Sequence, residues 1–128
     1  MAIFGAPFEY PDHPHKAVQA GLQMLEGHCR FVAGLPPEKK FSIRIGINSG
    51  ETVAGYFGSL HRMEYTVIGE IVNLAKRLQS LAEPGTICLG KTTYEAVKHH
   101  YAAELVGKIS ISKGTKEIEI YQIRPGVC

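Results

Sequence analysis

The first third of the chain carries hydrophobic residues at helical spacing. Across residues 14–33 the apolar positions fall three and four residues apart, which predicts an amphipathic helix. Pro14 suits the first helical turn, where its missing N–H has no partner to lose, and Gly34 ends the pattern. The apolar positions are Val18, Leu22, Leu25, Cys29 and Val32.

The pattern then changes to strict alternation, which is typical of half-buried strands. In residues 41–48 the side chains of Phe41, Ile43, Ile45 and Ile47 share one face. A turn signal at 49–50 follows, and residues 51–58 predict the return strand of a hairpin. After a loop at 59–63, residues 64–68 predict another short strand.

A second helix is predicted over residues 70–81, where Val72, Ala75, Leu78 and Leu81 form an apolar stripe. Residues 86–90 predict a short buried strand, and a short helix follows through Lys98. Two alternating runs at 103–112 and 117–123 predict a hairpin whose turn is residues 113–115. The fold class is therefore α/β or α+β, a single domain over residues 1–128 with one sheet covered by helices.

The composition narrows the functional classes. Hydrophobic residues make up 45% of the chain, and the net charge is +2 with interspersed signs, so we expect no nucleic-acid partner. No apolar stretch is long enough for direct membrane insertion. The start, MAIF, lacks the basic region of a signal peptide. The three scattered cysteines favour a reducing, cytoplasmic location, with Cys29 and Cys88 as small core residues.

Candidate chemistry lies near the start of the second predicted helix. Asn73 and Arg77 are four residues apart and share a stripe beside the apolar one. An Arg fork fits phosphate oxygens and an Asn amide both donates and accepts, so the pair could grip a sugar and a phosphate. The alternative is ordinary surface polarity, and spacing alone favours that alternative.

A longer string changes this balance. Residues 43–78 read IRIGINSGETVAGYFGSLHRMEYTVIGEIVNLAKRL, with an EPG-T-I turn after them and a K-G…E-I-x-I-Y run near the end. This string resembles the catalytic domain of the class III nucleotidyl cyclases, and within that family the bacterial-type adenylate cyclases. The resemblance implies a ferredoxin-like cyclase domain with one mostly antiparallel sheet. Its activity would convert ATP to 3′,5′-cyclic AMP and pyrophosphate at a dimer interface.

The resemblance also implies roles for individual residues. Asn73 matches the residue that orients the ribose, and Arg77 matches the one that stabilises charge on the transferring phosphate. Such charge neutralisation is what phosphoryl transfer needs most from a protein. Thr66 matches the base-selecting position, and the backbone of Val67 would contact the base edge. In the family one subunit supplies the metal-binding residues and the other supplies the Asn, the Arg and the base-reading residues. Arg44 matches an Arg on the metal-bearing side that reaches the nucleotide phosphates.

The chain departs from the family in two places. The first residues, MAIF, are apolar and predict a strand. The resemblance implies that the family's two aspartates, which bind Mg²⁺ or Mn²⁺, precede this strand, and Asp12 is the single Asp of this chain. The family often places a phosphate-binding Lys directly after a Gly, whereas here Thr115 separates Gly114 from Lys116. The resemblance thus implies Lys116 as a shifted phosphate-binding candidate, and a solvated Lys in a turn is the alternative. We expect a domain truncated at its N-terminus, without metal ligands and inactive alone.

Three hypotheses remain open at this point. In the first, a homodimer or a heterodimer with a complete cyclase domain forms a working site from this chain's ATP-reading residues. In the second, the chain is a non-catalytic dimerisation or regulatory module. In the third, a completed domain uses GTP, because Thr66 is half of a base-reading pair. The chain could also pair its unpaired sheet edge with another copy, or belong to a longer protein.

Overall fold

The computed structural model describes residues 1–6, 10–51, 53–59, 62–111 and 116–125. Three α-helices, one short 3-10 helix and six strands occur in these ranges. In chain order they are α1 (His13–Ala33), η1 (Pro37–Lys39), β1 (Ile45–Ile47), β2 (Val53–Ser59), β3 (Arg62–Ile68), α2 (Glu70–Leu81), β4 (Ile87–Gly90), α3 (Lys91–Val97), β5 (Glu104–Ile111) and β6 (Lys116–Ile123).

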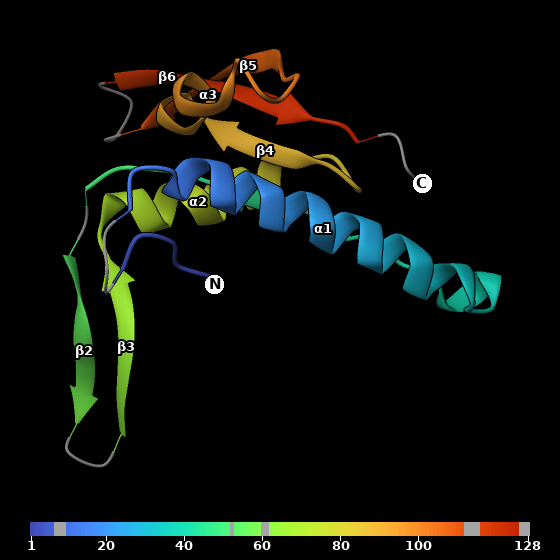
Figure 1. Cartoon of the computed structure of the whole chain (residues 1–128), viewed down its shortest axis with the longest axis horizontal. Coiled ribbons are helices and arrows are strands. Elements are labelled where there is room, and N and C mark those ends of the chain that lie inside the picture. The colour runs from blue at the N-terminus through green and yellow to red at the C-terminus, as the bar shows by residue number, and fades with distance from the viewer. Residues whose placement is uncertain (7–9, 52, 60–61, 112–115, 126–128) are drawn as a thin grey trace.

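Four of the strands form a mixed sheet in the order β1-β4-β6-β5. The β1–β4 pair is parallel, whereas the β4–β6 and β5–β6 pairs are antiparallel, so the sheet is mostly antiparallel as expected. Helices α1 and α3 lie over one face of this sheet and α2 covers the other (Figure 1). The predicted α+β architecture is confirmed, and the turn predicted at 113–115 falls outside the described residues.

The predicted hairpin between residues 41–48 and 51–58 is wrong. Strand β2 pairs with β3 in a separate antiparallel ribbon that extends away from the body (Figure 1). Strand β1 pairs instead with β4, in register from Ile45 opposite Ile87. Alternation of apolar and polar residues indicates a strand but not which strand it pairs with. The crossover through α2 brings β4 beside β1. In this position Ile45 and Ile47 pack against the core.

Helix α2 crosses directly over β1 at Gly46. A Cβ added to Gly46 would lie 2.3 Å from the backbone nitrogen of Gln79, so a side chain has no room at this crossing. The apolar stripe predicted on α2 is right for the fully buried Leu78, but Leu81 is exposed. Leu74 packs against that core in its place, so the buried stripe is rotated from the predicted one.

The cysteines differ from each other. Cys88 is a free, buried thiol between the sheet and α2, as predicted for a small core residue. Cys29 is half-buried and disulfide-bonded, so the prediction of a reduced core thiol is wrong for this residue. Its bonding is a property that the spacing of three cysteines did not indicate.

No described helix has both the length and the apolar character that crossing a membrane requires.

Candidate active site

The first two turns of α2 present the predicted pair. Gly69 connects β3 to α2 with φ of 131°, a left-handed conformation that favours glycine at this tight junction. The backbone N–H of Asn73 donates to the backbone carbonyl of Gly69 over 3.2 Å, which makes the first hydrogen bond of the helix. Asn73 and Arg77 are both exposed, one helical turn apart on one face. The predicted juxtaposition of amide and guanidinium is therefore present on the surface.

A carbonyl of the sheet holds the guanidinium of Arg77 in place. Its Nη1 donates to the backbone oxygen of Ser110, near the end of β5. The next residue, Ile111, is the register partner of Lys116 at the start of β6. Lys116 therefore begins β6 beside the end of β5 to which Arg77 donates. The structure thus brings Arg77 and Lys116 to the same end of the sheet.

Thr66 and Val67 lie on β3, immediately before the Gly69 junction. Their register partners on β2 are Gly55 and Ala54. Few residues separate these two positions from Asn73 along the chain, so the base-reading and ribose-binding candidates share one strand–turn–helix segment. The strand predicted at 64–68 is confirmed and extends back to Arg62.

Arg44 occupies a different place. It is exposed directly before β1 and lines a cavity of about 700 Å³ beside that strand. Lys76 and Gln79 of α2 line this cavity, whereas Asn73 and Arg77 do not contribute to it. Within one chain, the structure therefore separates Arg44 from the other substrate-binding candidates.

The described residues do not fit the metal pair that the resemblance implies. Over the described ranges, His, Cys, Asp and Glu side chains form no group of three or more that could hold an ion. Asp12 stands at the N-terminal boundary of α1 and makes no side-chain cap there. We therefore assign no metal ligand and derive no catalytic step through a metal.

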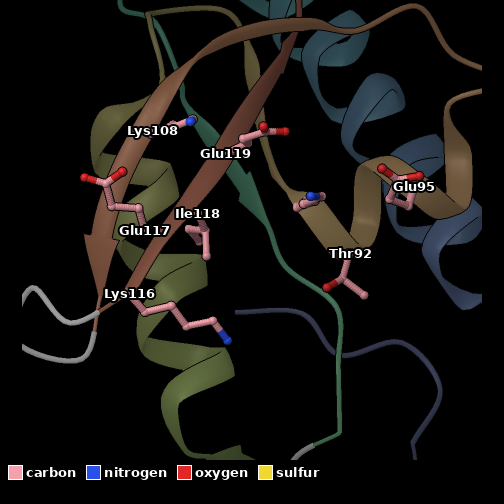
Figure 2. Close-up of a pocket in the computed structure, with 8 residues that line it drawn as sticks. Thr92, Glu95, Lys108, Lys116, Glu117, Ile118 and Glu119 are labelled. Atoms are coloured by element: carbon pink, nitrogen blue, oxygen red, sulfur yellow. The ribbon is translucent and has the colours of Figure 1, made fainter.

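A second groove opens beside β6, where β4 has ended and no longer pairs with residues 116–119 (Figure 2). Its volume is about 700 Å³. Lys91 and Thr92 at the start of α3 form one side, and Lys116 and Glu117 form the other. Lys116 therefore lines an open groove together with charged residues of both signs.

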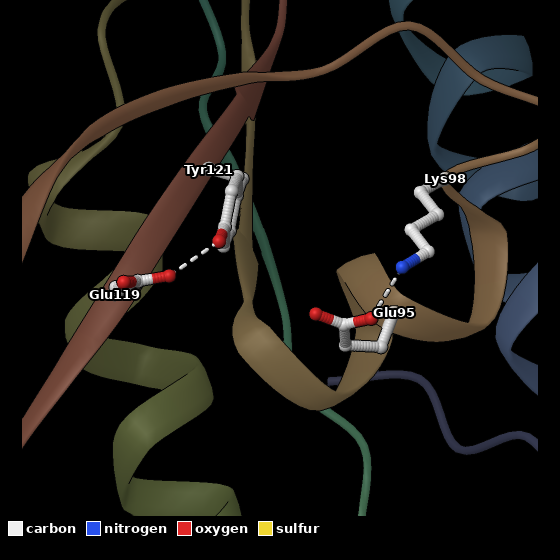
Figure 3. Close-up of polar contacts among 4 residues, drawn as sticks. All are labelled: Glu95, Lys98, Glu119 and Tyr121. Carbon is white, nitrogen blue, oxygen red and sulfur yellow. Dashed lines mark hydrogen bonds and ion pairs between the residues drawn. The ribbon is translucent and has the colours of Figure 1, made fainter.

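A tyrosine pair borders this groove and was missed by the sequence analysis. The rings of Tyr94 and Tyr121 are stacked with centroids 3.7 Å apart. The hydroxyl of Tyr121 donates to Glu119 over 2.5 Å (Figure 3). That hydrogen bond raises the pKa of Tyr121 to about 12. On α3, the hydrogen bond from Lys98 lowers the pKa of Glu95. The alternation of Glu119 and Tyr121 on one strand face was the available signal.

The family model for the adenylate and guanylate cyclase catalytic domain matches residues 1–125. The chain belongs to this family. Among curated relatives, it is 33% identical to soluble guanylate cyclase 89Da of Drosophila melanogaster, over 98% of this chain and 18% of that protein. It is 29% identical to receptor-type guanylate cyclase gcy-28 of Caenorhabditis elegans, over 94% of this chain and 10% of that one. The chain thus spans less than a fifth of the length of these relatives.

Solved cyclase domains share the fold. The adenylyl cyclase CyaB of P. aeruginosa is 34% identical with a TM-score of 0.82, covering 94% of this chain and 64% of that one. The guanylate cyclase domain of RhGC from Catenaria anguillulae, solved with GTP, is 28% identical with a TM-score of 0.78 and the same coverages. The family and fold are therefore shown, and both base specificities occur among the similar structures.

Proposed function

We propose that this cyclase domain supplies the ATP-reading half of an adenylate cyclase site, which forms cyclic AMP and pyrophosphate at an interface with a second cyclase domain. The observation that carries the proposal is the exposed pair of Asn73 and Arg77, with Arg77 fixed on the Ser110 carbonyl beside Lys116. Two cations and an amide at one end of a sheet suit a nucleotide that carries a ribose and a chain of phosphates.

Each of these three side chains has a distinct role in the proposal. The Arg77 guanidinium neutralises charge that develops on the transferring phosphate, an effect worth on the order of 10³-fold or more in rate. Lys116 binds the phosphates farther from the ribose as a point charge. The Asn73 amide orients the ribose so that its 3′-oxygen lies in line with the phosphorus, which lowers the entropic cost of the reaction.

The choice of ATP rests on β3. Thr66 is proposed to read the base edge with the backbone of Val67, in the pattern of the bacterial-type adenylate cyclases that the sequence resembles. The CyaB comparison supports ATP, whereas the curated guanylate cyclase relatives support GTP. Parallel titrations with ATP and GTP decide between them, and ATP is expected to bind at least about tenfold more tightly, as one well-made polar contact allows.

The second cyclase domain has a defined task. It provides the acidic residues that the resemblance assigns to the metal-bearing side, because no suitable group occurs among the described residues of this chain. Arg44, which lines the separate cavity, belongs in this proposal to the opposite half-site of the dimer. A cytoplasmic location fits the use of ATP and is part of the same proposal.

The test is complementation. This chain is mixed with a family cyclase disabled at its own matching Asn and Arg, heterodimer formation is verified by mass, and cyclic AMP is measured. The wild-type chain should restore activity, and Arg77→Ala should reduce it by about 10³-fold. The control is Lys76→Ala, a neighbouring exposed cation on α2 that lines the other cavity and should leave the restored activity unchanged. A verified heterodimer that makes no cyclic AMP would overturn the proposal.

A non-catalytic module is the second candidate. The β2–β3 ribbon extends from the body and its two strands pair with each other, which leaves backbone edges available to a partner chain. In this case the Asn73→Ala, Arg77→Ala double variant should keep full affinity for a cyclase partner while nucleotide binding is absent. A large loss of partner affinity in the double variant would exclude a purely structural role.

A further inference from the structure

The turn after β1 contacts two helices at once. The Nδ2 of Asn48 donates to the carbonyl of Ile71 in the first turn of α2, over 3.2 Å. The neighbouring Ser49 is buried, and its Oγ lies 2.7 Å from Oγ1 of Thr93 in α3. Adjacent residues of one turn therefore hold different helices, so the two contacts can be separated by mutation.

The amide of Asn48 is held in position by its surroundings. A Cβ placed on Gly90 would lie 2.4 Å from the Oδ1 of Asn48, so the glycine leaves the space that this side chain occupies. On the other side, a Cβ on Gly50 would lie 2.7 Å from Cδ1 of Ile71. The turn is thus packed directly against the first turn of α2, and Asn48 has little freedom to rotate away.

Helix α2 depends on such external support. Its N-cap residue is Gly69, which has no side chain that could cap the helix start. A helix start that lacks this contribution frays more readily. Asn73 stands in this same first turn, two residues after the carbonyl that Asn48 binds. Any fraying of the turn therefore moves the ribose-binding candidate.

We propose that Asn48 is a positioning residue that fixes Asn73 through the Ile71 carbonyl. This inference rests on the proposed role of Asn73 in nucleotide binding. The hydrogen bond from Asn48 ties the first turn of α2 to the turn after β1, which limits movement of that helical turn and sets the direction of the Asn73 side-chain amide. Asn48 itself does not touch the nucleotide in this scheme.

The first experiment is independent of any nucleotide. Asn48→Asp keeps the size of the side chain but replaces the donating Nδ2 with an oxygen, which cannot donate to the Ile71 carbonyl at neutral pH. Hydrogen exchange is followed at two backbone N–H groups. One is that of Asn73, which is hydrogen-bonded to the Gly69 carbonyl, and the other is that of Ala82, which is hydrogen-bonded to the Leu78 carbonyl at the other end of α2. Exchange at Asn73 should accelerate about tenfold, the usual effect of one hydrogen bond, with Ala82 unchanged.

Ser49→Ala is the matched control. It removes the hydrogen bond to Thr93 from the same turn and should leave exchange at Asn73 unchanged. Gly90→Ala is a second route to the same effect, because its Cβ would displace the Asn48 amide without altering that side chain. Equal acceleration at Asn73 and Ala82 in either Asn48→Asp or Gly90→Ala would overturn the proposal, since it would mean general loosening.

The second experiment is a double-mutant cycle on nucleotide affinity in the verified heterodimer, with a fluorescent ATP analogue as the probe. Asn48→Asp should weaken binding about tenfold in the wild-type background and have no effect after Asn73→Ala. Additive effects would overturn the positioning role. If Asn73→Ala alone leaves affinity unchanged, the proposed nucleotide function fails instead, and the exchange experiment still decides whether Asn48 holds the first turn.

Discussion

The two faces of the four-stranded sheet differ in the number of buried residues that pack on them. Under α1 and α3, seven buried residues form the larger described core. Under α2, four buried residues form the smaller one. Neighbouring positions of the same strand supply both: Cys88 packs toward α2, whereas Ile87 and Leu89 pack toward α1 and α3.

This difference explains where chemistry can reside. The α1/α3 face carries the larger core beneath two helices, so its buried side chains are committed to packing. The α2 face is covered by one amphipathic helix, whose outer surface leaves Asn73 and Arg77 exposed beside the end of β5. A helix that is buried along one stripe can carry exposed functional groups on the next stripe without loss of core. We therefore expect the α1/α3 face to set stability and the α2 face to set binding.

The largest expected effect comes from emptying the larger core. Leu89→Ala removes a fully buried side chain and should lower the free energy of unfolding by about 4 kcal/mol. Leu78→Ala removes a fully buried side chain from the smaller core under α2 and should lower the free energy of unfolding by about 3 kcal/mol. The loss is smaller because this core can collapse further around the cavity. Urea unfolding of both variants measures the two values. A larger loss for Leu78→Ala would reverse the ranking of the faces.

The next largest effect is expected at Gly46, where the crossing of α2 over β1 leaves no room for a side chain. Gly46→Ala puts a Cβ against backbone atoms of Gln79 and Ala75, which cannot move as a flexible side chain would. We expect a loss of about 3 kcal/mol from overpacking, measured by thermal or urea unfolding. Gly27→Ala is the control, since its Cβ would meet no atom within 4 Å and should be neutral or stabilising.

Features that depend on interactions between residues close in sequence could be predicted from the sequence, and features that depend on distant contacts could not. Helix α2 was predicted at its observed bounds because its period is local, and the pairing of β5 with β6 follows from a short connection. The β1 partner was mispredicted because a parallel pairing across a helical crossover leaves no mark in the local alternation. Spacing placed Asn73 and Arg77 on one stripe, and the family resemblance supplied their proposed roles.

Other features depend on contacts that no pattern contains. The bond from Asn48 to the Ile71 carbonyl joins residues that are distant in sequence, and the space for it is made by Gly90 on another strand. The exposure of Leu81 follows from the exact rotation of α2 over Gly46, which the apolar stripe gave only approximately. These contacts required the assembled sheet.

A smaller expected effect is a pH dependence of the free energy of unfolding that comes from the α1/α3 side. The hydrogen bond to Glu119 raises the pKa of Tyr121, on the α1/α3 side, to about 12 in the folded state. Because the folded pKa lies above the ordinary value near 10, this stabilisation is complete below about pH 10 and is lost as pH rises toward 12. The stability difference between wild type and Tyr121→Phe should therefore shrink across that window. Urea unfolding at several pH values measures it, and a growing difference would contradict the assignment.

A still smaller effect is expected in the rate at which the Cys88 thiol is chemically modified. Burial under α2 raises the pKa of the Cys88 thiol to about 11 from 9.0. Since the thiolate is the reactive form, a thiol reagent at pH 8 should modify Cys88 at least about a hundredfold more slowly in the folded domain than in urea. The Cys88→Ser variant identifies the signal. Rapid modification of the folded domain would mean that the α2 face opens more readily than its packing indicates.

The last prediction is a near absence of effect on stability. Asn73 is exposed, and its side chain makes no hydrogen bond to another described residue. Alanine has the higher helix propensity, so Asn73→Ala should raise the free energy of unfolding by about 0.5 kcal/mol. Unfolding and nucleotide affinity measured on the same preparation test both halves of the comparison between faces. A gain in stability together with a loss in affinity would place Asn73 in binding, whereas a stability loss above about 1 kcal/mol would place it in the fold.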